Sequence, residues 1–429
     1  MRCRYLYFSY LMSLVFVIYV ADLKAEPLKV SVDASSALLI NAETGQVLYE
    51  KNSDKQYFPA STTKIATALF ALKKKKDFLG DKVTAQQDSI GSILSAEKVR
   101  SNYTLPAYWI EKGSSHIGIK RGEIFCLEDL FYGMMIASGN DAANVIAQDV
   151  SGSVPKFMEG LNTYLQEMGC KKTVFYNPHG LHHPKHLTTA EDLALIAREA
   201  MKEPFFRKLV STVRYTRPET NKQESSVFVQ TNQIIRPNSR YYYPKAIGIK
   251  TGYTGEAGYA LVAAARDGER TLIAVLLKCS ERGDSFEGAK KLFESAFNQR
   301  KLRRVLLNKG IQELTTQVEG ASTPLVTYLD RDVFVEYYLA EEPDIRANVF
   351  WKNLKSPIEK GECVGEIRLA SQNTSFEQTV YLYAAEDVQS SLWFFIREMW
   401  GAYRTIFLGA VFVSVAMLFI LQLLRKRKT

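Results

Sequence analysis

Cysteine is scarce in this sequence, and no two cysteines form a C-x-x-C pair. Cys3 lies in the N-terminal segment, and the other four are Cys126, Cys170, Cys279 and Cys363. None of them stands where the lipid-carrying cysteine of a lipoprotein would, which argues against that kind of anchor. Two of the last four can pair in an exported chain, but their spacing does not decide between a disulfide and free thiols.

Nucleic-acid-binding motifs are also absent, although the chain of 429 residues carries a net charge of +9. No basic stripe interleaved with aromatic residues occurs, so we expect no nucleic-acid partner. Part of the positive charge is local, in residues 73–76, residues 425–428, Arg2 and Arg4. We interpret the excess as a solvated face together with the flanks of membrane segments.

The N-terminal segment has the layout of a secretory signal peptide. Arg2 and Arg4 precede an apolar run at residues 11–20, and Ala25 stands at a plausible cleavage position. We therefore predict a signal peptide over residues 1–25. The residue three positions before the cut would be Leu23, which is larger than usual there, so an uncleaved anchor is the alternative.

A second apolar run, residues 406–424, lies near the C-terminus and is interrupted only by Ser414 and Gln422. A helix of this length is about 28 Å long, enough to cross the lipid bilayer. The basic tail 425–429 follows, and the positive-inside rule puts such a tail in the cytoplasm. We predict a transmembrane helix that anchors the chain in the bacterial cytoplasmic membrane, with its body on the outer, periplasmic side.

Between these segments the hydrophobic pattern changes near residue 300. Residues 26–300 mix predicted strands and helices, which indicates an α+β domain with an antiparallel sheet covered by helices. From about residue 317 to residue 383 the chain is rich in Val, Thr, Tyr and Phe at period two. This pattern predicts a small β-sandwich domain of unknown partner over residues 301–388, followed by a juxtamembrane linker over 389–405. In the first domain we expect strands at 28–32, 36–40, 47–50, 116–119, 247–250, 257–265 and 272–277, and helices at 127–137, 142–150, 156–169, 188–202 and 285–297.

The chemistry of the chain centres on Ser61 and Lys64, an S-x-x-K pair. Positions i and i+3 share one face of a helix, so the hydroxyl and the amine can meet. A serine becomes a nucleophile when a base takes its proton, and a lysine is such a base only when burial or another cation lowers its pKa. The mostly apolar residues 65–72 predict a buried helix. Pro59 marks its entry, which leaves the N–H of Ser61 free for a substrate oxygen.

An S-x-x-K pattern alone is common and recurs at Ser95 and Ser153. Two further motifs that follow the pair along the sequence therefore support its assignment as an active site. An S-x-N motif follows, and K-T-G occurs once, at a predicted strand end. The residues of these two motifs, with the tyrosine after the second, are Ser138, Asn140, Lys250, Thr251, Gly252 and Tyr253.

The three motifs together resemble the active-site set of penicillin-binding proteins and serine β-lactamases. Residues 59–64, 137–142, 177–181, 188–194 and 248–252 look like one branch, the D-alanyl-D-alanine carboxypeptidases of the low-molecular-mass type. The resemblance covers about residues 28–300. It implies a β-lactamase/transpeptidase-like domain, and the small β domain and the membrane-bound end fit the layout of that branch.

The resemblance implies a peptidoglycan stem peptide ending in D-Ala-D-Ala as substrate. Ser61 would attack the penultimate carbonyl, and Lys64 would accept the proton. Lys250 would keep Lys64 neutral by like-charge repulsion, and Ser138 would relay a proton to the leaving amine. A β-lactam mimics the substrate amide and should acylate Ser61.

The remaining assignments concern substrate binding. Asn140 would bond the substrate amide, and Thr251, with Lys250, would bind the terminal carboxylate. Gly252 and Tyr253 continue this strand edge, and the Tyr253 N–H would join that of Ser61 in an oxyanion hole. Arg282 is the nearest candidate for an arginine that the branch often places near the carboxylate, although a solvated loop arginine is an equal alternative.

Other functions fit the sequence less well. A class A β-lactamase carries Glu-x-x-Leu-Asn, whereas this chain has Met158 in the glutamate position before Leu161 and Asn162. A D,D-endopeptidase that cleaves peptide cross-links uses the same chemistry and stays open. A non-catalytic wall-binding relict is disfavoured because every motif residue is intact.

Four of the five histidines lie close together, at His179, His182, His183 and His186. Clustered histidines suggest a metal site, but no carboxylate or cysteine lies among them, and Pro184 disfavours a helix that presents ligands four residues apart. We therefore expect a structural loop and neither a metal nor another cofactor.

Overall fold

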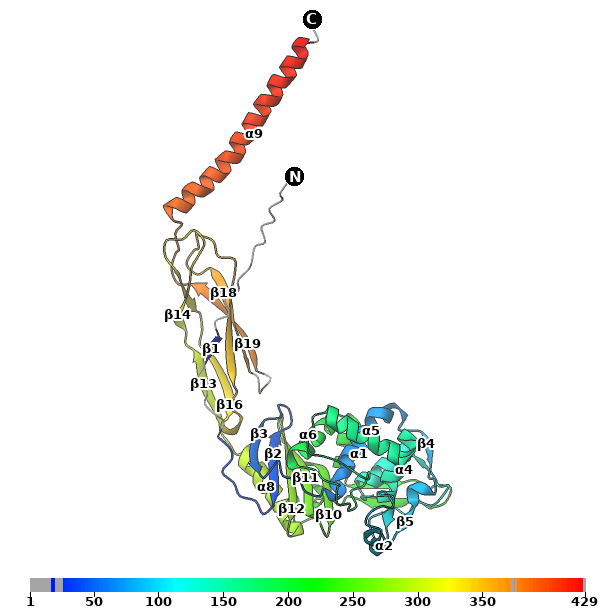
Figure 1. Ribbon diagram of the computed structural model, residues 1–429. Coiled ribbons are helices and arrows are strands. Elements are labelled where there is room, and N and C mark those ends of the chain that lie inside the picture. The colour runs from blue at the N-terminus through cyan, green and yellow to red at the C-terminus, as the bar shows by residue number, and fades with distance from the viewer. Residues whose placement is uncertain (1–16, 20–25, 372–373, 375, 427–429) are drawn as a thin grey trace. The chain divides into compact units, whose positions relative to one another are not determined.

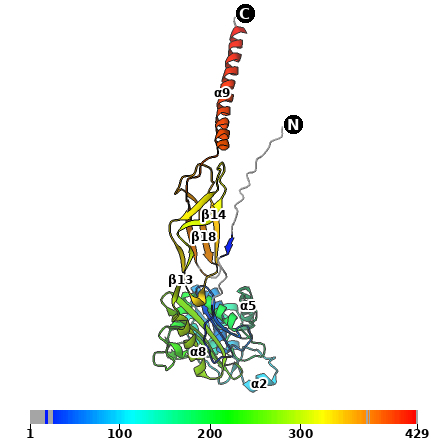
Figure 2. The ribbon, with the colours of Figure 1, turned by 90° about the vertical axis from the view of Figure 1, so that its left-hand side faces the viewer.

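The computed structural model describes residues 17–19, 26–371, 374 and 376–426 (Figures 1 and 2). The chain divides into two compact units. The larger unit comprises Ala25–Arg300 together with Tyr338–Glu342, and the smaller unit contains Lys301–Tyr337 and the chain from Pro343 onward. Most of the predicted signal peptide and residues 427–429 of the predicted tail lie outside the described residues, so both stay predictions.

An antiparallel sheet of five strands forms the centre of the larger unit, in the order β10-β11-β12-β2-β3. The strands predicted at 36–40, 47–50, 247–250, 257–265 and 272–277 are all confirmed. The last strand of the unit pairs with the first, which brings both ends of its sequence into one sheet. The bounds are Ser36–Asn41 (β2), Val47–Lys51 (β3), Ala246–Thr254 (β10), Gly258–Asp267 (β11) and Arg270–Cys279 (β12).

Helices cover both faces of this sheet, which confirms the expected α+β architecture. Along β12, Ile273 and Val275 pack into one hydrophobic cluster and Ala274 and Leu276 into another, because successive side chains point to opposite faces. Helix α8 packs on the second face, and α1 and α6 pack on the first. The helices are Thr63–Lys75 (α1), Ser95–Arg100 (α2), Leu127–Met135 (α3), Asn140–Ser151 (α4), Val154–Glu167 (α5), Ala190–Ala200 (α6), Pro204–Ser211 (α7) and Arg282–Phe297 (α8).

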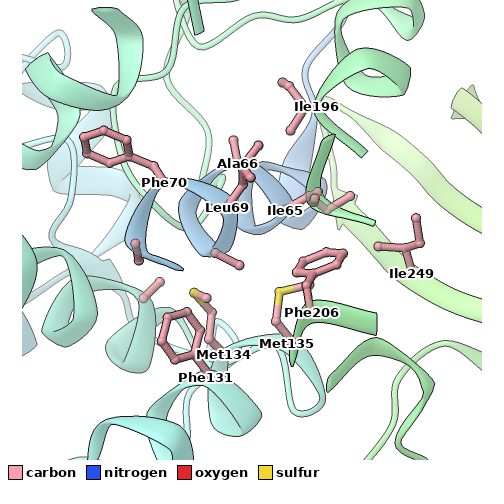
Figure 3. Close-up of a cluster of buried hydrophobic side chains, with 14 of the residues drawn as sticks. Ile65, Ala66, Leu69, Phe70, Phe131, Met134, Met135, Ile196, Phe206 and Ile249 are labelled. Atoms are coloured by element: carbon pink, nitrogen blue, oxygen red, sulfur yellow. The ribbon is translucent and has the colours of Figure 1, made fainter. Parts of the chain in front are cut away.

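Helix α1 lies inside the first hydrophobic cluster of the larger unit. Every residue from Thr63 to Leu72 is buried, as expected for a helix that is apolar nearly all round. Figure 3 shows Ile65 and Leu69 of α1 among side chains of the surrounding elements, including Phe131 and Phe206. The helix ends in residues 73–75, where its dipole favours cations. The predicted burial around Lys64 is confirmed.

Three local predictions need correction. Residues 28–32 form no strand. The Leu28 N–H donates one hydrogen bond to Leu48 O, and the apolar side chains of this segment pack into a hydrophobic cluster without regular strand pairing. Residues 116–119 form no strand either, because the N–H groups of Ile117, Gly118 and Ile119 bond to the carboxylate of Asp141. The K-T-G motif lies inside β10 and not at its end, since pairing continues to Thr254. Short strands complete the unit at Lys82–Thr84 (β4), Ser92–Ile93 (β5), Ile110–Glu111 (β6), Ile124–Cys126 (β7), Arg214–Arg217 (β8) and Ser226–Val229 (β9).

The smaller unit contains a sheet in the order β1-β17-β18-β19-β15-β14 and a second pairing of β13 with β16. Alternate residues such as Ile367, Leu369, Val380 and Leu382 form its buried cluster. The strands are Val17–Tyr19 (β1), Lys301–Leu307 (β13), Gly310–Thr316 (β14), Leu325–Leu329 (β15), Val333–Tyr338 (β16), Ile345–Trp351 (β17), Cys363–Ser371 (β18) and Glu377–Ala384 (β19).

A long apolar helix, Leu392–Lys426 (α9), follows this sheet. The predicted linker over 389–405 therefore enters the helix at Leu392. Within the described part of the chain, Leu392–Leu418 is the one stretch with the length and composition to cross a membrane. The four cysteines in the described residues, Cys126, Cys170, Cys279 and Cys363, are free thiols.

Candidate active site

The turn that carries Ser61 is a 3-10 turn, Ala60–Thr62, directly before α1. Ala60 adopts a left-handed conformation with φ of 47°, which is uncommon for a residue with a side chain. Two hydroxyls tie the turn together: Thr62 Oγ1 donates to Pro59 O at 2.7 Å, and Thr63 Oγ1 donates to Ala60 O at 2.9 Å. Ser61 is therefore held on a rigid turn at the start of a buried helix.

The amine of Lys64 has three close partners. Nζ lies 2.9 Å from Ser61 Oγ, 2.7 Å from Asn140 Oδ1 and 2.8 Å from the backbone oxygen of His179. Complete burial lowers the pKa of Lys64 well below its usual value; the Lys250 charge lowers it further, and Asp141 opposes both effects. A neutral amine has two N–H bonds and one lone pair. Because both carbonyl oxygens can only accept, the lone pair is left facing the Ser61 hydroxyl.

The S-x-N motif lies at the start of α4. Ser138 has φ of 62° and lines the same cleft as Ser61. Asn140, expected to bond the substrate amide, already has two protein partners, since its Oδ1 faces Lys64 and its Nδ2 donates to Ser114 Oγ at 3.0 Å. In this structure the Asn140 side chain thus orients Lys64.

The K-T-G motif brings β10 against the Ser61 turn. A Cβ on Gly252 would stand 3.0 Å from the Ser61 backbone nitrogen and 2.9 Å from Pro59 O, so only glycine permits this approach. Lys250 is fully buried, its amine donates to Thr251 O at 3.1 Å, and burial lowers its pKa to about 7. Lys250 therefore acts on Lys64 from inside the protein and does not line the cleft.

A cleft of about 330 Å³ opens at this point. Of the predicted residues it is lined by Ser61, Ser138, Thr251, Gly252, Tyr253 and Arg282. The structure thus places Arg282 at the site, which the loose sequence match left undecided. It also adds Ser115, Thr231, Tyr259, Ala260, Ser285 and Phe286, which belong to no motif and come together only through folding.

The strand that borders the cleft has a free edge within the described residues, because β10 is the last strand of its sheet. Such an edge offers unpaired N–H and C=O groups to an extended peptide. Tyr253 is exposed, and its ring lies 4.4 Å from that of Tyr259 on β11. The cleft can therefore hold a short extended peptide beside Ser61.

The histidine cluster is built into the fold. His179 Nε2 lies 3.0 Å from Tyr108 O, and His186 Nε2 lies 2.9 Å from Thr63 Oγ1. Burial lowers the pKa of both rings well below the usual value, which keeps them neutral. Among the described residues no group of histidines, cysteines and carboxylates has the arrangement of a metal site.

A serine beside a buried lysine, on a turn facing a free strand edge, is the arrangement of a serine hydrolase whose nucleophile is activated by a neighbouring amine. Comparison with known proteins identifies the family. The family model for D-alanyl-D-alanine carboxypeptidase matches residues 22–281, and the chain belongs to this family of serine peptidases. The family membership predicted from the three motifs is confirmed.

Relatives and solved structures agree. The chain is 32% identical over 349 residues to the D-alanyl-D-alanine carboxypeptidase DacF of Bacillus subtilis, covering 79% of this chain and 81% of the relative. It is 30% identical over 372 residues to DacC of Escherichia coli, covering 81% and 82%. Penicillin-binding protein 5 of Haemophilus influenzae superposes with a TM-score of 0.57 at 25% identity, over 84% of this chain and 99% of that one.

Proposed function

We propose that the protein removes the terminal D-alanine from peptidoglycan stem pentapeptides through an acyl-enzyme on Ser61. The observation that carries this proposal is the position of Lys64, whose amine nitrogen lies 2.9 Å from Ser61 Oγ and whose side chain is fully buried. The family membership supports the substrate class. The stem peptide would lie along the edge of β10.

In the first half-reaction Ser61 Oγ attacks the carbonyl carbon of the penultimate D-alanine, and Lys64 takes the hydroxyl proton. The backbone N–H groups of Ser61 and Tyr253 stabilise the oxyanion; the loss of one such donor typically costs about 2.7–4 kcal/mol. The C–N bond then breaks, and the leaving amine receives a proton from Ser138, which is replenished from Lys64. Free D-alanine and the acyl-enzyme result.

In the second half-reaction water attacks the ester carbonyl, and Lys64 again takes a proton. The C–O bond to Ser61 breaks, the proton returns to Oγ, and the shortened peptide leaves. A β-lactam contains an amide of the same kind. When Ser61 opens its ring, the amine stays attached to the acyl group and no small product leaves. We therefore expect β-lactams to acylate Ser61.

Recognition of the free carboxylate is assigned to Arg282 and Thr251, since both line the cleft whereas Lys250 is buried. A cation that lines the cleft favours a carboxypeptidase, whose substrate ends in a free carboxylate, over a D,D-endopeptidase, whose substrate continues past the scissile bond. A defined pentapeptide and a cross-linked muropeptide, assayed side by side, separate the two. The carboxypeptidase requires faster release of D-alanine than of cleaved cross-link.

Covalent labelling with fluorescent penicillin tests the nucleophile. The wild-type chain and the control variants Ser95→Ala and Ser153→Ala should label, and Ser61→Ala should not. Mass spectrometry of the adduct should find the modification on Ser61. Labelling of the Ser61→Ala variant would mean that the nucleophile is misassigned, and an unlabelled wild-type chain would favour the non-catalytic relict.

In this proposal the rest of the chain determines where in the cell the catalytic unit is held. The apolar helix α9 anchors the protein in the cytoplasmic membrane, and the larger unit faces the periplasm after export through the N-terminal signal. The smaller unit, with the alternating pattern of a β-sandwich and no catalytic cluster predicted from its sequence, is a spacer or docking module. Membrane fractionation and protease accessibility of intact cells test this orientation.

A further inference from the structure

One wall of the cleft is a loop, Ser114 to Ile119, that the motifs do not explain. Ser115 lines the cleft, and its backbone oxygen accepts a hydrogen bond from the Asn140 N–H at 2.9 Å. Ser114 Oγ accepts from Asn140 Nδ2 at 3.0 Å. The loop is therefore joined to both the backbone and the side chain of the residue that faces Lys64.

The loop is held in turn by Asp141, a residue that no motif assignment uses. Its carboxylate is buried and accepts the backbone N–H groups of Ile117, Gly118 and Ile119 at 2.9–3.0 Å. It also accepts the N–H of Ala142 at 2.9 Å. Gly118 has φ of 79°, and such a left-handed residue lets successive N–H groups converge on one anion.

We propose that Asp141 is a positioning residue for the Ser61–Lys64 pair, acting through the Ser114–Ile119 loop and Asn140. The proposal rests on the proposed function of that pair. Ser114 accepts from Asn140 Nδ2, which leaves Oδ1 toward Lys64. Without the loop the amide is free to turn and present its NH₂ group to the amine. Lys64 then loses a carbonyl acceptor, and its lone pair is no longer directed at Ser61.

The charge of Asp141 provides a second, independent readout. The charged side chains that act on the Lys64 amine are Lys250 from β10 and Asp141 from α4. The nearby ring of His179 is kept neutral by burial and by the Lys64 charge. Burial and then Lys250 lower the pKa of Lys64, and Asp141 raises it. Removal of the carboxylate charge therefore lowers that pKa further. Acylation needs neutral Lys64, so the acid limb of its pH profile must move to lower pH.

The test is Asp141→Asn in the full-length protein, with the rate constant for penicillin acylation measured across a pH series. We expect the acid limb to move to lower pH and the plateau rate to fall by up to about a hundredfold, as for a misplaced reacting group. Gly118→Ala disturbs the loop without changing charge. Gly118→Ala should lower the plateau rate of acylation and leave the acid limb of the pH profile unmoved. It replaces Asp141→Asn if the latter does not fold.

Asp192→Asn is the matched control. Asp192 is also a buried carboxylate that holds a loop, through the N–H groups of Lys171 and Lys172, but it is not among the groups that shift Lys64. It should lower thermal stability without moving the limb. The inference is overturned if the acid limb of the pH profile does not move in Asp141→Asn, or if it moves by the same amount in Asp192→Asn. Failure of the wild-type chain to label instead overturns the proposed function.

Discussion

A methyl group at position 252 would test whether the contact between β10 and the Ser61 turn is needed for acylation. In Gly252→Ala the added Cβ would stand 2.9 Å from Pro59 O, 3.0 Å from the Ser61 nitrogen and 3.1 Å from Ala60 Cβ. The first two atoms belong to the backbone and cannot rotate away. The strand and the turn must separate by a few tenths of an ångström, and the proposed oxyanion donor moves with them.

The magnitude follows from that donor. Loss of one oxyanion-hole hydrogen bond costs about 2.7–4 kcal/mol, which is about a hundred- to a thousandfold in rate. Overpacking adds about 1–3 kcal/mol of lost stability, so thermal unfolding should be recorded beside the kinetics. The assay is the second-order rate constant for acylation by fluorescent penicillin, measured well below the melting temperature.

Gly255→Ala is the matched control in the turn that follows β10. A Cβ at Gly255 meets nothing within 4 Å, and the residue needs no left-handed backbone. This variant should acylate at the wild-type rate. If folded Gly252→Ala acylates within a few-fold of wild type, or if both variants lose the same fraction of the rate, the contact between β10 and the Ser61 turn is not needed for acylation.

Three further predictions address charge and attachment. Lys250→Met should lose activity yet raise the free energy of unfolding by about 4 kcal/mol at pH 7. A buried lysine with a pKa of about 7 destabilises the fold, and this cost disappears only when the unfolded chain also deprotonates near 10.5. Denaturant titrations should show the gain in stability shrinking as the pH rises between these two values. Arg282→Gln should lower kcat/KM about ten- to a hundredfold for a peptide with a free carboxylate, and leave kcat/KM unchanged for the same peptide with a C-terminal amide. Equal losses on both peptides would contradict carboxylate binding by Arg282. A chain that ends after Ser391 should stay in the soluble fraction, whereas one that ends after Tyr403 keeps the exposed Trp393 and Trp400 and should still bind vesicles.

Much of the fold was predictable because its elements follow local rules. The strands β11 and β12 and the buried helix α1 contain mostly apolar runs bounded by turn residues or charged residues, and such runs indicate burial by themselves. The errors fell where the backbone departs from regular pairing. Residues 28–32 and 116–119 alternate like strands, but the first are buried by packing and the second are bonded to Asp141.

From the amino-acid sequence alone the family could be predicted, because three motifs occur in the expected order. The proximity of Ser61 and Lys64 could be predicted too, because residues at i and i+3 share one face of a helical turn. Only the tertiary structure decided how that pair is tuned. The carbonyl of His179, the amide of Asn140 and the charge of Lys250 come from distant segments, and a pKa depends on which groups surround the amine in space. Arg282, Ser115 and Asp141 likewise gained their places at the site from folding, since proximity between elements far apart in sequence leaves no local pattern to read.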